Sequence, residues 1–167
     1  TLKRINVDAV IEIFEAAEAR GVRRAIFVSS SGTVGVGPNG TPGDETAPPP
    51  TIADDNLYFR SKVLAGEAVA AWLPGRKLEV VTILPGWMYG PYDAAPTSSG
   101  QIVLDFLHRK LPAIIPGAGS VVDARDVAQG MIAAVTQGRN GERYLIGGRS
   151  HTLAEIIGCL EEVSGVP

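Results

Sequence analysis

Tyr58 and Lys62 are the two residues whose types and spacing point most directly to chemistry. Residues four apart lie one helical turn from each other, so both side chains face the same side of a helix. A lysine ammonium beside a tyrosine lowers the pKa of the phenol, and such a tyrosine exchanges protons with a carbonyl or an alcohol near neutral pH. The same spacing also occurs on ordinary helix faces, where a lysine packs its alkyl chain and keeps its charge in water. The pair alone leaves both interpretations open.

Polar and turn-forming residues follow two predicted strands on either side of this helix. Residues 25–28 are a continuous apolar run that ends in the three serines at 29–31, and residues 78–84 are a second apolar run that ends in Pro-Gly at 85–86. Continuous runs of this kind are typical of parallel strands buried on both faces. In open α/β sheets, ligands bind beyond the carboxyl ends of the strands. The serines, the Pro-Gly turn and Tyr58 are therefore expected to face one crevice.

The elements that must position these residues follow from the periodicity. A helix is predicted over 2–19 and another over 55–72, with Asp54 or Asp55 as its cap. Residues 32–53 are rich in Gly and Pro and are predicted as a long loop. Strand, helix and strand in this order predict a βαβ unit with a parallel sheet. Later in the chain, helices are predicted over 100–110, 126–136 and 152–163, and strands over 120–122 and 142–146.

The composition excludes several classes of function. The net charge is −3 and no run of Lys and Arg occurs, which argues against a nucleic-acid surface. No apolar run approaches the roughly 20 residues of a membrane span. The single cysteine, Cys159, lies in an apolar stretch and is expected to be buried, so no internal disulfide and no metal site are predicted. A reducing cytoplasm fits this cysteine usage.

These motifs together resemble the extended short-chain dehydrogenase/reductases, the NAD-dependent epimerase/dehydratase family. The resemblance extends over nearly all of the chain. It implies an α/β fold that contains the C-terminal part of a Rossmann-like parallel sheet, with the partial Rossmann-like region over 1–92. A small mixed α/β substrate-binding region over 93–167 follows, with segments that return to the core. The matching segments are Asn6-Val7, residues 21–24, residues 27–30, Tyr58 and Lys62, residues 84–86, residues 89–91, residues 122–128, residues 141–144 and the Thr-Leu-x-Glu sequence that opens the last helix.

The resemblance also implies a role for each residue of the catalytic set. Tyr58 is the acid/base on the reacting oxygen, and Lys62 holds the nicotinamide ribose hydroxyls and lowers the pKa of the tyrosine. Ser30 hydrogen-bonds the same substrate oxygen. Ser30 is assigned this role because the family's catalytic Ser or Thr usually stands five residues before a glycine, which is Gly35 in this sequence. Ser31 is the reserve candidate, since three serines in a row leave the register open by one. Hydride passes between the substrate carbon and the nicotinamide.

Cofactor and substrate residues follow from the same resemblance. The cofactor is NAD or NADP, and the substrate is a small molecule. Trp87, Met88 and Tyr89 are expected either to line a substrate pocket or to pack within their loop. The cofactor-binding candidates are Tyr58, Lys62, Ser29, Pro85 and Gly86, and the substrate-binding candidates are Ser31, Trp87, Met88 and Tyr89.

Departures from the family's patterns narrow the reaction. Sugar-nucleotide 4,6-dehydratases typically carry Asp-Glu directly after the catalytic Ser or Thr, where this chain has Ser31 and Gly32. Epimerases of UDP-sugars usually have tyrosine before the closing glycine, where this chain has Val34. The Ser-Ser-x-Gly-Thr-Val run instead resembles the dihydroflavonol-reductase-like branch, which reduces carbonyl groups. The resemblance thus implies an NAD(P)-dependent epimerase, dehydratase or reductase of the extended type, and these departures argue against a sugar 4,6-dehydratase.

The glycine-rich dinucleotide fingerprint that opens a Rossmann fold does not occur in the sequence. The chain is therefore expected to begin in mid-domain. The residue that selects NAD or NADP follows the fingerprint by about 20 positions, so it is not expected within this sequence. Two alternatives to an enzyme stay open: a cofactor-binding regulator without turnover, and a fragment that is inactive as it stands. The family also commonly dimerises through two helices, so a homodimer is expected through the helices at 2–19 and 55–72.

Overall fold

The computed structural model describes residues 2–51, 55–114 and 116–166. Its strands form two sheets of three strands each. The first sheet is parallel and has the order β1 (Arg24–Val28), β2 (Glu79–Pro85) and β5 (Arg143–Ile146). The second has the order β3 (Trp87–Tyr89), β4 (Ala118–Asp123) and β6 (Arg149–Thr152), with β3 parallel and β6 antiparallel to β4. The expected α/β class with a partial Rossmann-like parallel sheet is confirmed.

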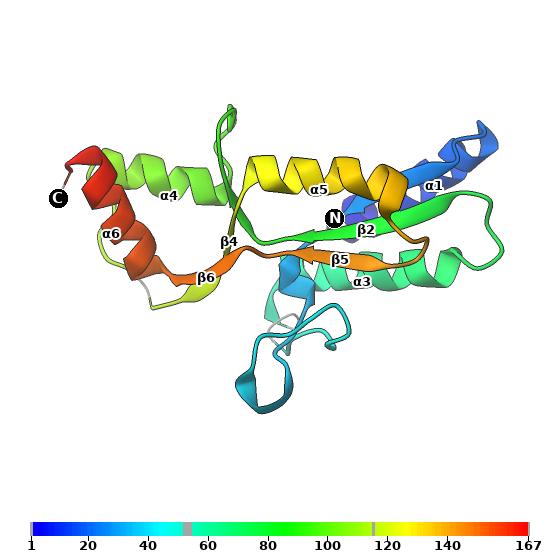
Figure 1. Cartoon of the computed structure of the whole chain (residues 1–167), viewed down its shortest axis with the longest axis horizontal. Coiled ribbons are helices and arrows are strands. Elements are labelled where there is room, and N and C mark those ends of the chain that lie inside the picture. The colour runs from blue at the N-terminus through cyan, green and yellow to red at the C-terminus, as the bar shows by residue number, and fades with distance from the viewer. Residues whose placement is uncertain (1, 52–54, 115, 167) are drawn as a thin grey trace.

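Helices cover both faces of the first sheet. Figure 1 shows α5 on one side of β2 and β5 and α3 on the other, while α4 and α6 lie at the far end beside the second sheet. A π-helical turn, η1 (Arg4–Asp8), leads into the first long helix. The helices are α1 (Ala9–Ala19), α3 (Leu57–Trp72), α4 (Ser98–Leu107), α5 (Ala124–Gln137) and α6 (Leu153–Ser164).

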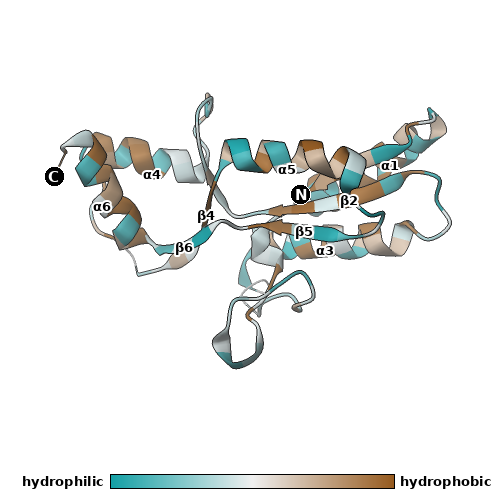
Figure 2. Cartoon of the chain, viewed as in Figure 1, coloured by the Kyte–Doolittle hydropathy of each residue, from teal (hydrophilic) through white to brown (hydrophobic). Residues whose placement is uncertain are grey.

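The central strand β2 is buried on both faces, as its continuous apolar run predicts. Alternate side chains point to opposite faces of a strand. Val80 accordingly packs with Phe27 and the α1 and α3 side chains, whereas Val81 and Ile83 pack with α5. Figure 2 shows the hydrophobic colour along β2 and alternating bands on α5, the pattern of a helix with one buried face.

Glycines occupy the two connections through which the chain passes from the first sheet to the second. The chain passes from β2 to β3 through Gly86, and from β5 to β6 through residues 147–148. A Cβ on Gly86 would lie 2.5 Å from the carbonyl oxygen of Ser120, while its N–H donates to Ile146 O at 3.0 Å. Gly148 adopts a left-handed φ of +67° against the backbone of β4. The crossing therefore requires glycine for close packing.

The start of α3 differs from the prediction. Asp54 lies outside the described residues, and Asp55 is not the cap. Asn56 caps the helix instead, because its side-chain oxygen accepts from the N–H groups of Tyr58 (3.0 Å) and Phe59 (3.2 Å). The helix consequently begins at Leu57.

Two strands were missed, and the prediction that Cys159 is buried is wrong. β3 is only three residues long and β6 (Arg-Ser-His-Thr) is polar, so neither carries a strand pattern. Cys159 is exposed, because it follows the buried Ile157 of α6 by two residues and falls on the opposite side of the helix. Ala65 and Ala68 of α3 pack into this chain's own core with α1. No helix in the described parts of the chain is long and apolar enough to cross a membrane.

Candidate active site

The first turns of α3 carry Tyr58 and Lys62 on one side of the helix. The Nζ atom of Lys62 lies 5.8 Å from the centroid of the Tyr58 ring. Tyr58 is 47% exposed and Lys62 is half-buried. Burial lowers the pKa of the Lys62 ammonium, because the charged form loses part of its hydration. The spacing therefore produces the cation and phenol pair that the sequence predicts.

The serine turn begins where β1 ends. The backbone N–H of Ser29 donates to Ile83 O at 2.9 Å and so continues the pairing with β2 by one residue. Ser30 caps a short 3-10 turn: its Oγ accepts from Gly32 N at 3.1 Å, and its carbonyl accepts from Thr33 Oγ1 at 2.8 Å. The Ser30 hydroxyl hydrogen has no acceptor among the described residues. It is therefore free to be donated to a ligand.

An aromatic contact brings the serine turn against the start of α3. The Phe59 ring covers Gly32 so closely that a Cβ there would overlap the ring. The same ring lies 5.6 Å from that of Tyr58, centroid to centroid. Phe59 lies between Tyr58 and Lys62 in the sequence and belongs to neither the motif nor a recognisable apolar pattern. Sequence reasoning therefore missed its contribution.

A short hydrogen-bond chain links the N-terminal helix to the Tyr58 turn. Asn6, inside the π-helical turn, donates through Nδ2 to Ser61 Oγ at 2.9 Å. The Ser61 hydroxyl in turn donates to the carbonyl oxygen of Tyr58 at 2.7 Å. Ser61 is 4% exposed, so burial of its hydroxyl depends on both bonds. The partner of Asn6 is therefore Ser61, which the sequence did not reveal.

The candidates that follow β2 lie at the crossing between the sheets. Pro85 is buried at the end of β2, and Gly86 packs against β4. On β3, Trp87 is 37% and Met88 40% exposed. The Tyr89 hydroxyl is buried, and burial raises the pKa of this phenol against a smaller opposing effect of the nearby Ser99 side chain.

A cavity of about 480 Å³ opens between α3, one face of β2 and the long loop. Lys62 lines it together with Ser29 and Thr82, whose side chains are largely buried. The loop is held there by Glu45: its carboxylate accepts from Leu145 N at 2.7 Å, and its carbonyl accepts from the Arg143 guanidinium. Sequence reasoning missed Glu45, because its partners lie about 100 residues away.

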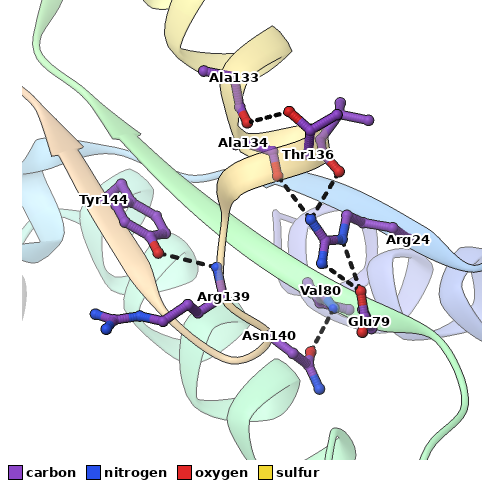
Figure 3. Close-up of polar contacts among 10 residues, drawn as sticks. Arg24, Glu79, Val80, Ala133, Ala134, Thr136, Arg139, Asn140 and Tyr144 are labelled. Carbon is purple, nitrogen blue, oxygen red and sulfur yellow. Dashed lines mark hydrogen bonds and ion pairs between the residues drawn. The ribbon is translucent and has the colours of Figure 1, made fainter.

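A separate polar cluster lies at the opposite, amino-terminal end of the strands (Figure 3). Arg24 pairs with Glu79 and donates to the carbonyls of Ala134 and Val135, at the end of α5. Asn140 accepts from Val80 N at 2.8 Å. The Arg24 bonds reach two carbonyls in the last turn of α5 and so fix this helix to the sheet. The cluster is a scaffold contact, remote from the strand ends that carry the serines.

No cluster of three or more metal-ligating side chains occurs within the described ranges. The structure brings together Tyr58, Lys62 and the serine turn. They offer a phenol, an ammonium and a hydroxyl beside the carboxyl end of a parallel strand. Such a set donates and accepts protons at one oxygen and can hold vicinal hydroxyls.

The chain belongs to the NAD dependent epimerase/dehydratase family, whose model matches residues 1–147. It is 34% identical over 163 residues to the sterol demethylase protein B of Methylococcus capsulatus, covering 98% of this chain and 49% of that protein. It is 33% identical over 171 residues to a putative dihydroflavonol 4-reductase of Synechocystis, covering 99% of this chain and 49% of that protein. The chain thus spans about half the length of these curated relatives.

Two solved structures share the fold of this chain. The crystal structure of gox2253 superposes with a TM-score of 0.92 at 30% identity, over all of this chain and 51% of that one. The NAD complex of UDP-glucose 4-epimerase from Thermus thermophilus superposes with a TM-score of 0.79 at 24% identity, over 97% of this chain and 55% of that one. The second likeness shows the fold alone.

Proposed function

We propose that the full-length protein containing this chain is an NAD(P)-dependent oxidoreductase or epimerase that acts on a hydroxyl or carbonyl group. One observation carries the proposal. Tyr58 and Lys62 share one side of α3, and the Ser30 turn packs against the first turn of the same helix. A phenol, an ammonium and a free hydroxyl hydrogen at one strand end are the groups that proton transfer to an oxygen requires.

The proposed roles follow from the chemistry of each group. The Tyr58 phenol gives a proton to the substrate oxygen during reduction, or takes one during oxidation. The Ser30 hydroxyl donates a hydrogen bond to the same oxygen, since its own oxygen already accepts from Gly32. The Lys62 ammonium stabilises negative charge on the phenol oxygen and, as a three-hydrogen donor, suits the ribose hydroxyls of the nicotinamide nucleotide. NAD or NADP, when bound, supplies or accepts the hydride.

Carbonyl reduction is the direction that these surroundings favour. Dehydration needs an additional acid or base, and Gly32 has no room for a side chain beneath the Phe59 ring. The similarity to a putative dihydroflavonol 4-reductase supports the same direction. We propose that Ser29, Pro85 and Gly86 lie on the cofactor side. Ser31, Trp87, Met88 and Tyr89 are proposed for the substrate side.

The test is turnover by the full-length protein, followed as nicotinamide absorbance with a panel of ketones and nucleotide sugars. Turnover of a ketone that falls by about 100-fold or more in Tyr58→Phe is expected, which is the range of a lost general acid. Tyr92→Phe is the matched control, because Tyr92 is 97% exposed. Nicotinamide binding without turnover of any substrate would favour a cofactor-binding regulator. Unchanged turnover in Tyr58→Phe would overturn the roles above.

We also propose that the full-length protein is a homodimer that pairs α1 and α3 with their copies. Leu57, Leu64 and Ala71 recur at seven-residue spacing on α3 and are exposed, with Leu57 at 71%. Ile13 of α1 is 63% exposed. Apolar side chains gathered on neighbouring helices support a contact between subunits. A cytoplasmic location is proposed with it, since a reducing compartment keeps the exposed Cys159 thiol free.

A further inference from the structure

The Phe59 ring contacts the Tyr58 ring and the turn that contains Ser30. Its ring centroid is 5.6 Å from that of Tyr58, and the two ring planes are tilted by 60°. Its other side covers Gly32, where a Cβ would come within 2.5 Å of the ring atom Cδ1 and closer still to Cε1. Phe59 is half-buried although its neighbours Tyr58 and Arg60 are exposed. One ring therefore contacts the tyrosine and the serine turn together.

Gly32 connects this contact to the serine hydroxyl. Its backbone N–H is the donor that Ser30 Oγ accepts, at 3.1 Å. Any displacement of Gly32 therefore shifts the group that orients this hydroxyl. Gly32 does not have a left-handed φ, so glycine is required here for space and not for backbone conformation. The requirement comes from the Phe59 ring.

We infer that Phe59 and Gly32 are a positioning pair that sets the separation of the Tyr58 phenol from the Ser30 hydroxyl. The inference rests on the proposed function, because it concerns the geometry of the same two groups. Two donors that bind one oxygen must be held closely, and a misplacement of about 1 Å can cost ~100-fold in rate. The Phe59 side chain has no polar atom that could exchange a proton with a substrate. It acts through Tyr58 on one side and Gly32 on the other.

The same pair determines which reactions the site supports. With the ring in place, position 32 admits no side chain. The site therefore has no acid or base two residues after Ser30 and is limited to proton transfer at the oxygen that Tyr58 and Ser30 share. This fits alcohols with their aldehydes or ketones, and sugars epimerised through a ketone. A reduction takes one hydride from the nicotinamide and one proton from Tyr58, whereas an epimerisation first gives up one of each and then takes both back.

A double-mutant cycle in the full-length protein tests the pair, with Gly32→Ala, Phe59→Ala and the double variant. With Phe59 present, Gly32→Ala is expected to lower kcat by ~10-fold or more, with the substrate KM within about 2-fold, because orientation and not binding is lost. In the Phe59→Ala background, the same substitution is expected to change kcat by less than about 2-fold. Gly158→Ala is the control, because a Cβ there has no atom within 4 Å. It should leave kcat unchanged.

The readouts separate positioning from stability. Rates are compared at a temperature where circular dichroism finds every variant folded, and melting temperatures are measured alongside. Equal kcat losses from Gly32→Ala in both backgrounds would overturn the inference, as would coupling that appears only in the melting temperature. If Gly32→Ala alone does not fold, the double variant is expected to keep the kcat of Phe59→Ala within about 2-fold. A larger loss of kcat in the double variant would overturn the inference.

Tyr58→Phe distinguishes a failure of the proposed function from a failure of the Phe59–Gly32 positioning pair. Full turnover in Tyr58→Phe defeats the proposed function itself. Loss of turnover in Tyr58→Phe, together with an additive cycle between Gly32 and Phe59, defeats only the positioning pair.

Discussion

The carboxylate of Glu45 accepts a hydrogen bond from the backbone N–H of Leu145 at 2.7 Å. Leu145 belongs to β5, which pairs with β2 on one edge only, so Glu45 takes the place of a neighbouring strand at the other edge. The Arg143 guanidinium donates to the carbonyl of the same glutamate. The long loop after the serine turn is thus fastened to the sheet beside the cavity that Lys62 lines.

Removing this carboxylate is expected to destabilise the protein. Glu45→Ala leaves the half-buried N–H of Leu145 without its partner, which costs about 1–3 kcal/mol of unfolding free energy. Glu45→Gln keeps an acceptor oxygen and should retain most of the stability. Chemical denaturation of the three proteins measures the difference. Equal destabilisation by both variants would show that the bond is not the cause.

Burial of Lys62 predicts a pH dependence of stability. The folded-state pKa of Lys62 lies below its ordinary value of 10.5, so between these two values the unfolded chain binds more protons than the folded one. The unfolding free energy of the wild type should therefore rise, relative to that of Lys62→Met, as the pH increases through this window towards 10.5. The measurement is denaturant unfolding of both proteins at several alkaline pH values. A difference that stays flat or falls contradicts the burial of this ammonium.

Asp123 is expected to titrate at unusually low pH. Hydrogen bonds from the Arg125 side chain, and then from its backbone N–H, lower the pKa of the Asp123 carboxyl to about 2. The stabilisation is complete above the ordinary value of 3.8 and is lost as the pH falls through about 2. Arg125→Ala should raise this pKa but leave it below 3.8, since the backbone bond at 2.8 Å remains. Carboxyl chemical shifts measured against pH test this, and an unchanged midpoint in Arg125→Ala would refute it.

The proposed dimer makes a prediction for the outer face of α3. Leu64→Glu places a charge in the exposed apolar line of that helix and should convert the full-length protein from dimer to monomer at micromolar concentration. Ile132→Glu is the matched control, because Ile132 is exposed on α5 and outside the proposed contact. Sedimentation velocity distinguishes the two forms. A wild type that sediments only as a monomer rules out the proposed interface.

Local patterns predicted the parts of the fold that local physics determines. The run of buried residues in β2 required two covered faces, and the helix predicted to end at residue 19 ends at Ala19. The four-residue spacing of Tyr58 and Lys62 similarly required a shared helix side. Each of these features depends on neighbours within one or two turns.

Features that depend on distant partners were not predictable in this way. β6 is a polar strand that exists because β4 pairs with it, and Glu45 finds its partner 100 residues away. Phe59 matters through a glycine on another element, 27 positions earlier. Tertiary packing, and not propensity, selects these residues. Within the candidate site, the shared helix side of Tyr58 and Lys62 was therefore predictable, while the contact that holds the serine turn against this helix was not.

The most direct measurement of the central claim is single-turnover hydride transfer in the full-length protein carrying Tyr58→Phe, with nicotinamide affinity titrated in parallel. The phenol is proposed to supply the proton, so the account predicts hydride transfer slowed by about 100-fold or more. Nicotinamide affinity should stay within about 3-fold of the wild type, because Lys62 remains in place. A wild-type rate of hydride transfer in Tyr58→Phe would contradict the account.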